Sequence, residues 1–249
     1  MQFNFEARAK EQRLCNKHDG YTSLMFMRPD STEHWTGCPK CQDEIEQEKR
    51  QHERIQDEIE YKKRFITRLF NQAAIPPRFV DNSFDNYNID TTEQQVAKNT
   101  MMEFAQNIKD NLKFGRNAIL AGNPGNGKTH LSVATGRVAI NEGYTVLFTT
   151  VANMIDRINE AGWNKATTID NYAIPDLLIL DEVANHFNSE EQKNLFKVLN
   201  CRYEQIKSTI IQTNLSMDEL KAVLGDRIID RLRQNNCVVL YFTWESYRK

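Results

Sequence analysis

The stretch that decides the fold of this chain is Gly122-Asn123-Pro124-Gly125-Asn126-Gly127-Lys128-Thr129, which matches the pattern GxxxxGK[ST] at every fixed position. It follows a short apolar run, residues 117–121, and it opens a segment of helical character, residues 128–141. An apolar strand, a glycine-rich loop and a helix in this order form the context in which the pattern cradles phosphates. A chance glycine-rich turn is the alternative, and the agreement of pattern and context disfavours it.

The residue types in this loop suit a nucleotide and a metal ion. Glycines let backbone N–H groups curl around phosphate oxygens, and the helix start adds positive partial charge. We expect the loop and His130 after it to bind ATP or ADP, with Lys128 reaching the β- and γ-phosphates. The Thr129 hydroxyl is expected to ligate Mg²⁺.

Two carboxylates follow another apolar run. Asp181 and Glu182 come directly after Leu177-Leu178-Ile179-Leu180. A buried strand that ends in a carboxylate presents it at the edge of an α/β sheet where ligands bind. We therefore expect Asp181 to hold Mg²⁺ with Thr129, and Glu182 to activate water for attack on the γ-phosphate. A solvated loop is the alternative for an isolated Asp-Glu pair.

Two further polar groups extend this interpretation. Asn214 follows the run 209–213 and is expected to orient the attacking water beside Glu182. Arg227 and Arg231 are spaced i,i+4 and share one helical face. One of them is expected to reach the γ-phosphate of a neighbouring subunit as an arginine finger. A basic surface helix with Asp–Arg pairs is the alternative.

Around these motifs, short apolar runs alternate with helical segments. This alternation predicts a parallel sheet covered by helices on both faces, an α/β doubly wound fold. Ser189 is expected to cap one helix, with Gln192 completing a capping box. The expected strands are 117–121, 144–150, 176–180, 208–213 and 237–243, and the expected helices are 128–141, 151–160 and 189–204.

Composition limits the class of protein. The chain has 249 residues, a net charge of −2 and 40% hydrophobic residues, which allows a buried core and excludes a histone-like polycation. No apolar run approaches the roughly 20 residues that cross a bilayer. The first 14 residues contain no apolar signal core, so we expect a cytoplasmic protein with no membrane partner.

The N-terminal cysteines form a pattern typical of a metal site. Cys15-x₂-His18 and Cys38-x₂-Cys41 are separated by 19 residues, and the total of five cysteines is odd, which argues against a disulfide framework. Three thiolates and an imidazole suit tetrahedral Zn²⁺, and four protein ligands make its role structural. His34 is a rival for the histidine position, and a redox pair or unrelated thiols are the alternatives.

Three regions follow from these patterns. Residues 1–42 are expected to form the zinc-binding module, residues 43–75 a charged helix and linker, and residues 76–249 the nucleotide-binding domain. The charged helix has favourable i,i+4 pairs such as Glu46 with Arg50, and only a thin apolar stripe. It is either a solvated spacer or a helix that binds a partner. Ile75-Pro76-Pro77 marks the boundary, because the residue before a proline leaves helical geometry.

The combined motifs resemble one family. The chain resembles the AAA+ ATPases of the DnaC/IstB type, the bacterial and phage helicase loaders. The motifs that carry this likeness are GNPGNGKTHL, the ILDE strand, the TN strand end and the GDRIIDRLR…SYR tail. IPPRF and SFDNY resemble the entry to that family's ATPase domain, so the likeness covers about residues 75–249. It implies that Lys128 and Thr129 are Walker A, Asp181 and Glu182 Walker B, and Asn214 sensor 1. It also implies that Arg231, with Arg227 beside it, is the finger.

The resemblance carries further expectations. The region 151–174 corresponds to the position of a DNA-contacting insertion, which would make Arg157, Trp163 and Lys165 contacts for single-stranded DNA. The sequence after Thr243 leaves no room for the helical lid of typical AAA+ proteins, so slow hydrolysis and a switch-like role are expected.

The function that these expectations favour is loading of a hexameric DnaB-type replicative helicase onto single-stranded DNA, with ATP as a timer. The zinc module and charged helix would bind the helicase, and ATPase domains would self-associate. The main alternative is an IstB-type transposition accessory ATPase, which binds duplex DNA and recruits a transposase. A nucleotide-binding adaptor without hydrolysis and a small-molecule kinase are less favoured, because Lys128, Asp181 and Glu182 are intact and no acceptor pocket is visible.

Overall fold

The structure, a computed structural model, describes residues 7–28, 30–184 and 187–247. Their contacts divide the chain into two compact units, one up to Lys63 and the other from Arg64 onward. The finer division at residues 42 and 75 stays a proposal. Among the described residues, no helix is both long enough and apolar enough to pass through a bilayer.

The first unit begins with a small antiparallel sheet. Its strands are β1 (Ala9–Arg13), β2 (Tyr21–Met27) and β3 (Glu33–Trp35), in the order β1-β2-β3. The guanidinium of Arg13 lies 4.5 Å from the ring centroid of Trp35. The buried Ser23 donates to the Thr36 carbonyl at 2.6 Å. With so few buried apolar side chains, a sheet this small needs a further source of stability.

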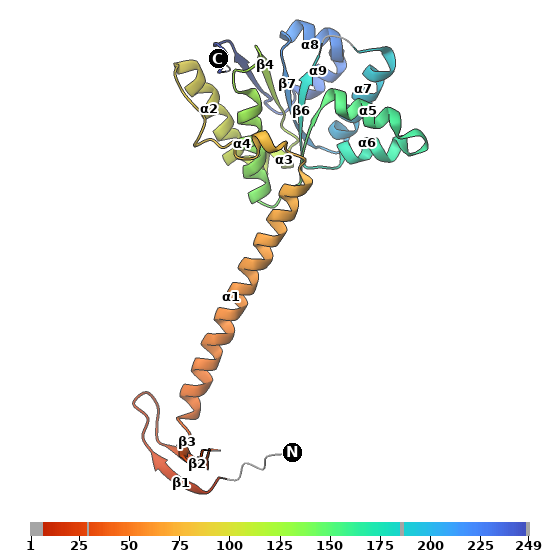
Figure 1. Cartoon of the computed structure of the whole chain (residues 1–249). Coiled ribbons are helices and arrows are strands. Elements are labelled where there is room, and N and C mark those ends of the chain that lie inside the picture. The colour runs from red at the N-terminus through yellow and green to blue at the C-terminus, as the bar shows by residue number, and fades with distance from the viewer. Residues whose placement is uncertain (1–6, 29, 185–186, 248–249) are drawn as a thin grey trace. The chain divides into compact units, whose positions relative to one another are not determined.

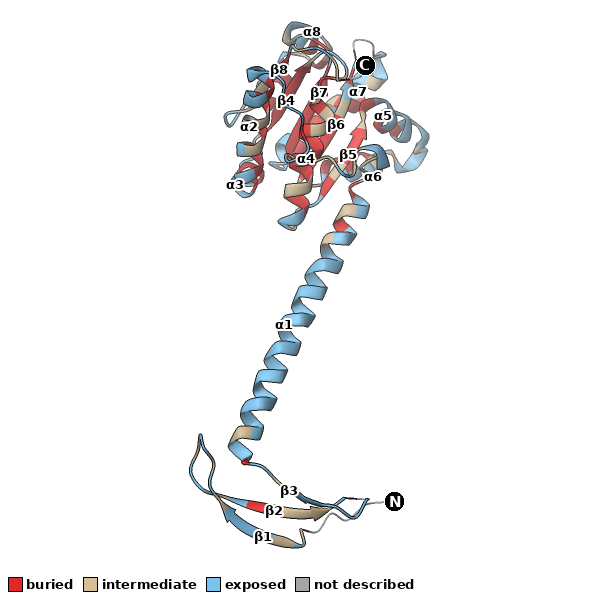
Figure 2. Ribbon diagram, turned by 60° about the vertical axis from the view of Figure 1, so that its left-hand side comes forward, coloured by how far each residue is buried: buried red, intermediate tan, exposed pale blue. Residues whose placement is uncertain are grey.

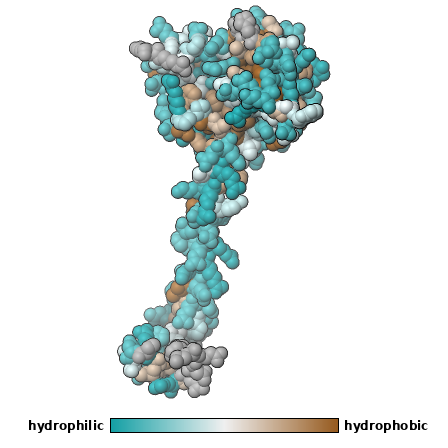
Figure 3. All heavy atoms as spheres, turned by 45° about the vertical axis from the view of Figure 1, so that its right-hand side comes forward, coloured by the Kyte–Doolittle hydropathy of each residue, from teal (hydrophilic) through white to brown (hydrophobic). Residues whose placement is uncertain are grey.

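Helix α1 (Pro39–Gln72) contains the charged segment that the sequence predicts to be helical. The expected i,i+4 pair forms, with Arg50 Nη2 lying 2.8 Å from Glu46 Oε1. Most of its surface before Arg64 is hydrophilic, with isolated apolar side chains (Figure 3). The large apolar side chains exposed along this part are Ile45, Ile55, Ile59 and Tyr61.

The second unit is built on a five-stranded sheet in the order β5-β6-β7-β4-β8, with all neighbours parallel (Figure 1). The expected doubly wound α/β fold is therefore confirmed. The strands are β4 (Ala118–Gly122), β5 (Val146–Thr150), β6 (Leu177–Val183), β7 (Ser208–Thr213) and β8 (Val238–Phe242).

Helices cover both faces of this sheet, and Figure 2 shows the strands as the buried layer between them. Successive side chains of a strand alternate between faces, so Leu177 and Ile179 enter one core while Leu178 and Leu180 enter the other. The helices are α2 (Thr92–Gln106), α3 (Ile108–Lys113), α4 (Lys128–Asn141), α5 (Val151–Glu160), α6 (Lys165–Ala173), α7 (Ser189–Glu204), α8 (Met217–Leu224) and α9 (Asp226–Leu232), with short 3₁₀ turns η1 (Pro77–Phe79) and η2 (Gly162–Asn164).

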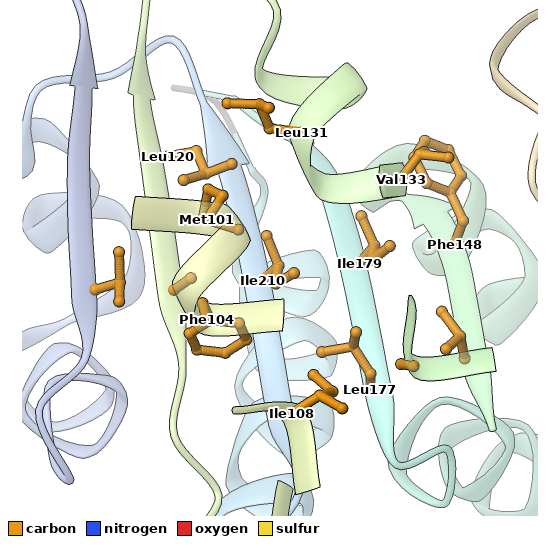
Figure 4. Close-up of a cluster of buried hydrophobic side chains, with 14 of the residues drawn as sticks. Met101, Phe104, Ile108, Leu120, Leu131, Val133, Phe148, Leu177, Ile179 and Ile210 are labelled. Carbon is orange, nitrogen blue, oxygen red and sulfur yellow. The ribbon is translucent and has the colours of Figure 1, made fainter. Parts of the chain in front are cut away.

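The core on the α2–α4 face is continuous from helix to sheet (Figure 4). Met101 and Phe104 of α2 pack with Leu120 of β4 and Ile210 of β7 in one buried cluster. The end of α1 joins it through Leu69, which is 5% exposed. This packing holds the start of α4, and with it the glycine-rich loop, against the sheet.

One local expectation is wrong. Helix α7 does have the expected bounds, but its cap is Asn188 rather than Ser189. The Asn188 side chain accepts from the Glu190 and Glu191 N–H groups, and Glu191, not Gln192, completes the capping box. Asn188 has the extended backbone that a cap needs, whereas Ser189 is already helical.

Candidate functional site

The glycine-rich loop lies between the carboxyl end of β4 and the start of α4, as its sequence predicts. Two of its glycines are required by close approach. A Cβ on Gly122 would overlap the Phe242 carbonyl, and one on Gly127 would lie 2.7 Å from the Tyr87 ring. Gly127 also has φ +94°, a left-handed conformation that side chains disfavour. The loop therefore passes beside β8 and the segment before α2.

Lys128 reaches back across this loop. Its Nζ donates to the carbonyls of Gly122 at 2.6 Å and Asn123 at 2.7 Å. It also lies 3.0 Å from Asn214 Oδ1, at the end of β7, and 3.4 Å from Asn126 Oδ1. The structure thus brings together the predicted Walker A lysine and the predicted sensor asparagine, 86 positions apart in the chain.

The two predicted magnesium ligands also meet. Thr129 Oγ1 donates to Asp181 Oδ2 at 3.2 Å. Burial raises the pKa of Asp181, although the hydrogen bonds from the Glu182 N–H and the Thr129 hydroxyl act in the opposite direction. A hydroxyl and a carboxylate are oxygen donors of the type that Mg²⁺ prefers, so these residues fit that ion.

Glu182 lies beside Asp181 in an unusual backbone conformation. It is exposed, with φ +59°, at an irregularity in the β6–β7 pairing between Leu180 and Val183. Left-handed geometry is uncommon in a residue other than glycine and often marks functional positions. The turn separates the two carboxylates, leaving Asp181 half-buried and Glu182 open to solvent.

The other residues of the loop differ in how far they are exposed to solvent. Asn123 and Pro124 are exposed, Gly125 is half-buried and Asn126 is fully buried. His130 points to the segment before α2, where its Nε2 donates to the Ser83 carbonyl at 2.8 Å. Its ring lies edge-on to Tyr87, with centroids 5.2 Å apart. Burial lowers the pKa of His130, although its hydrogen bond to the Ser83 carbonyl acts in the opposite direction.

The two predicted finger arginines lie elsewhere. Arg227 of α9 is exposed, whereas the Arg231 guanidinium lies 4.7 Å from the ring centroid of Tyr203. Arg231 lines a cavity of about 380 Å³ that includes Asn117 and Thr209, at the amino ends of β4 and β7. The glycine-rich loop follows the opposite end of β4, so neither arginine joins the phosphate loop of its own chain. Their action on a neighbouring subunit stays a prediction.

The four predicted zinc ligands come together in the first unit. The ligand atoms of Cys15, His18, Cys38 and Cys41 all lie within 4.8 Å of one another. His18 Nδ1 faces the sulfurs, at 3.7 Å from Cys15, 3.7 Å from Cys38 and 3.3 Å from Cys41. Three sulfurs and one imidazole nitrogen in this arrangement fit a structural Zn²⁺.

Neighbouring groups decide which histidine belongs to this cluster. His34 Nδ1 instead lies 3.0 Å from Arg28 Nη2, so the structure favours His18. His18 Nε2 donates to Glu44 Oε1 at 2.9 Å, which leaves Nδ1 for a metal. The Lys17 N–H donates to Cys15 Sγ, and this bond, together with the contacts to Cys41 and His18, lowers the pKa of that thiol to about 6.

The three predicted DNA contacts surround η2. Arg157 of α5 is exposed, and Trp163 of η2 is fully exposed, at 103%. Lys165 of α6 forms an ion pair with Glu190, with 2.8 Å between Nζ and Oε1. A phosphate would therefore compete with Glu190 for Lys165, and Trp163 is the most accessible of the three.

Sequence reasoning gave no role to the aromatic residues beside the loop, although Tyr87 and Tyr247 lie in the quoted SFDNY and SYR motifs. Trp244 and Tyr247, after β8, and Tyr87, before α2, all contact it. No local spacing connects Trp244 and Tyr247 to the loop, because they are more than 115 positions away from it in the chain. Arg248, the last residue of the SYR motif, lies outside the described residues.

Comparisons with known proteins agree with this geometry. A family model described as IstB-like ATP binding protein matches residues 46–249. The replicative helicase loader DnaC of Buchnera aphidicola subsp. Baizongia pistaciae is 35% identical over 67% of this chain and 69% of its own. The replicative helicase loader DnaC of Escherichia coli K12 is 29% identical, over 67% of this chain and 69% of its own.

A solved structure gives the same result for the fold. The crystal structure of the DnaC helicase loader aligns with a TM-score of 0.60 and 25% identity, over 67% of this chain and 99% of that one. The residues that the family model matches, 46–249, include all five strands of the parallel sheet and the glycine-rich loop. The chain belongs to the family of IstB-like ATP-binding proteins, the DnaC/IstB type of AAA+ ATPase.

Proposed function

We propose that the chain binds ATP·Mg²⁺ at the carboxyl edge of the sheet and hydrolyses it. The observation that carries this proposal is the meeting of Lys128 with Asn214 and of Thr129 with Asp181. The loop amides and Lys128 would hold the phosphates, while Thr129 and Asp181 would hold Mg²⁺, which neutralises developing charge when bound.

The chemical step falls to groups at the same edge. Glu182, exposed and adjacent to Asp181, would accept a proton from the attacking water. Asn214 would orient that water, using the amide that Lys128 contacts. Arg231, with Arg227, would complete the site of the next subunit, which makes hydrolysis depend on assembly. Slow turnover by the isolated chain follows from this arrangement.

We propose that this ATPase loads a hexameric DnaB-type replicative helicase onto single-stranded DNA in the cytoplasm. The similarity to proteins named replicative helicase loader DnaC supports this role. The zinc-containing N-terminal module and the exposed apolar side chains of α1, among them Ile45 and Ile55, would bind the helicase. Arg157, Trp163 and Lys165 would contact the DNA, with the indole of Trp163 stacking on a base.

The test is to mix the full chain with a DnaB-type helicase and ATP and to measure the mass of the complex by light scattering. A stoichiometric complex that delivers helicase onto single-stranded DNA is expected.

Lys128→Ala should reduce nucleotide binding by a factor of roughly 30 or more, because it removes a buried cation from the phosphates. If that variant loads helicase at the normal rate, the proposal that bound nucleotide controls loading is wrong. Lys193→Ala, on the exposed surface of α7, is the matched control.

A second function is favoured by the family model, which is described as IstB-like and spans residues 46–249. An IstB-type accessory ATPase would use the same nucleotide site, bind duplex DNA and recruit a transposase. Absence of a complex with the helicase, together with tight ATP-dependent binding to duplex DNA, would favour this second function over the loader.

A further inference from the structure

The segment that starts at the last residue of β8, residues 242–247, is hydrogen-bonded to the glycine-rich loop along two consecutive peptide units. The Tyr247 N–H donates to the Gly125 carbonyl at 2.9 Å, and the Trp244 indole Nε1–H donates to the Asn126 carbonyl at 3.0 Å. The buried side chain of Asn126 donates in return to the Phe242 carbonyl. We refer to residues 242–247 as the tail segment.

These bonds determine where the amides of the loop point. In a trans peptide the C=O and the following N–H lie on opposite sides of the bond, and no described peptide is cis. Holding the carbonyls of Gly125 and Asn126 toward the tail segment therefore turns the N–H groups of Asn126 and Gly127 away from it. Among the described residues, neither of these amides has a protein acceptor.

Aromatic packing keeps the tail segment in place. The Tyr247 hydroxyl donates to the Asn88 carbonyl at 2.9 Å, and its ring lies edge-on to Tyr87 at 6.0 Å between centroids. The Trp244 ring packs on Phe242, with centroids 4.8 Å apart. Phe242 is fully buried, so the tail segment is anchored in the core at one end and on the segment before α2 at the other.

We propose that Trp244 and the tail segment are a positioning device that pre-organises the loop amides for nucleotide phosphates. Without these bonds, the two peptide planes would be free to rotate, and binding would have to order them at a cost in affinity. This inference rests on the proposed ATP site, and it assigns to Trp244 a role in affinity rather than in the chemical step.

The experiment compares two single substitutions of the same kind. Trp244→Phe removes the indole N–H but keeps an aromatic ring on Phe242, and Trp35→Phe in β3 is the matched control. Dissociation constants for ATP and ADP, measured by calorimetry, should rise roughly 2- to 10-fold in Trp244→Phe, the range expected for one hydrogen bond. Trp35→Phe should match the wild type.

Two measurements distinguish a positioning role of Trp244 from a general loss of folding in the variant. The Tm without nucleotide should stay close to that of the wild type in Trp244→Phe, and kcat at saturating ATP should be unchanged while KM rises. If Trp244→Phe does not fold, Tyr247→Phe removes a different bond of the tail segment by deleting one oxygen, and it should raise the ATP dissociation constant about 2- to 5-fold.

The outcomes are distinct. Wild-type affinity for both nucleotides in folded Trp244→Phe would overturn this inference and leave the proposed function standing. Absence of ATP binding by the wild-type chain would overturn the proposed function itself.

Discussion

At the scale of the residue, Glu44 lies in the same first turns of α1 as Cys41. Its carboxylate accepts from His18 Nε2, so the imidazole presents Nδ1 to the three sulfurs. A carboxylate behind a ligating histidine fixes the ring orientation and increases its basicity as a ligand. The arrangement also explains why His18, and not His34, joins the cluster.

Glu44→Ala should therefore weaken zinc binding by roughly 10- to 100-fold. Competition with a chromophoric chelator at fixed pH measures the affinity. Glu48→Ala, on an exposed position of the same helix, removes the same charge away from the cluster and should have no effect. Equal affinities of the two variants would show that the Glu44 carboxylate does not support the site.

At the scale of the element, the start of α7 shows how one extended residue sets a helix boundary. Asn188 accepts two N–H groups that would otherwise lack partners, and Glu191 returns a bond to the Asn188 N–H. Ser189 has the right chemistry for a cap but sits one position too late. The two neighbours therefore form a natural pair for testing the boundary.

Asn188→Ala should destabilise the fold by about 1 kcal/mol, because the Glu190 and Glu191 amides lose their acceptor. That corresponds to a Tm lower by roughly 2–4 °C for a unit of this size. Ser189→Ala should change Tm far less, because alanine suits a first helical turn. Scanning calorimetry of both variants decides the matter, and a larger effect at Ser189 would contradict the capping assignment.

At the scale of the whole molecule, Arg202 joins elements that are distant in the chain. It is 1% exposed, yet its guanidinium donates to the carbonyls of Tyr172, Ala173, Pro175 and Ser208 and to the Thr209 hydroxyl. A planar five-donor group is suited to so many acceptors. Arg202 thereby ties α7 to the end of α6 and the start of β7.

Arg202→Lys keeps the charge but has only three N–H donors on one atom, so at least two of the five acceptors lose their partner. A loss of about 3 kcal/mol is expected, or a Tm lower by roughly 6–12 °C. Arg233→Lys, the same change at an exposed position, is the control. A fall of less than about 2 °C in Arg202→Lys would mean that lysine satisfies the same acceptors.

The two units should also respond differently to removal of zinc. The first unit has a small sheet and few buried apolar residues, so its order is expected to depend on the metal. The second has a large core of its own. A chelator should speed hydrogen exchange in residues 7–41 and leave β4–β8 protected, as read by mass spectrometry. Unchanged protection of residues 7–41 would show that zinc is not needed for their fold.

The sequence by itself determined the features that are local in the chain. Backbone propensity and periodicity act over a few consecutive residues, so features of that range can be read from the sequence. These features are the phosphate loop, the apolar strands, the bounds of α4 and α7 and the paired cysteine spacing. The motifs also predicted the roles of Lys128, Asp181 and Asn214, and the family resemblance agreed with them. Their joint position follows from parallel strands, whose carboxyl ends meet at one edge.

Only the tertiary structure decided the remaining features. They include the choice of Asn188 as the helix cap instead of Ser189, and the choice of His18 as the metal ligand instead of His34. They also include the contact of Arg231 with Tyr203 and that of Trp244 with the phosphate loop. Each depends on the backbone path or on a partner distant in sequence. A hydrogen bond or a ring contact carries no period, so residue patterns do not report it. Such contacts exist because packing brings the chain segments together, and that packing is the physical reason they appear only in the folded molecule.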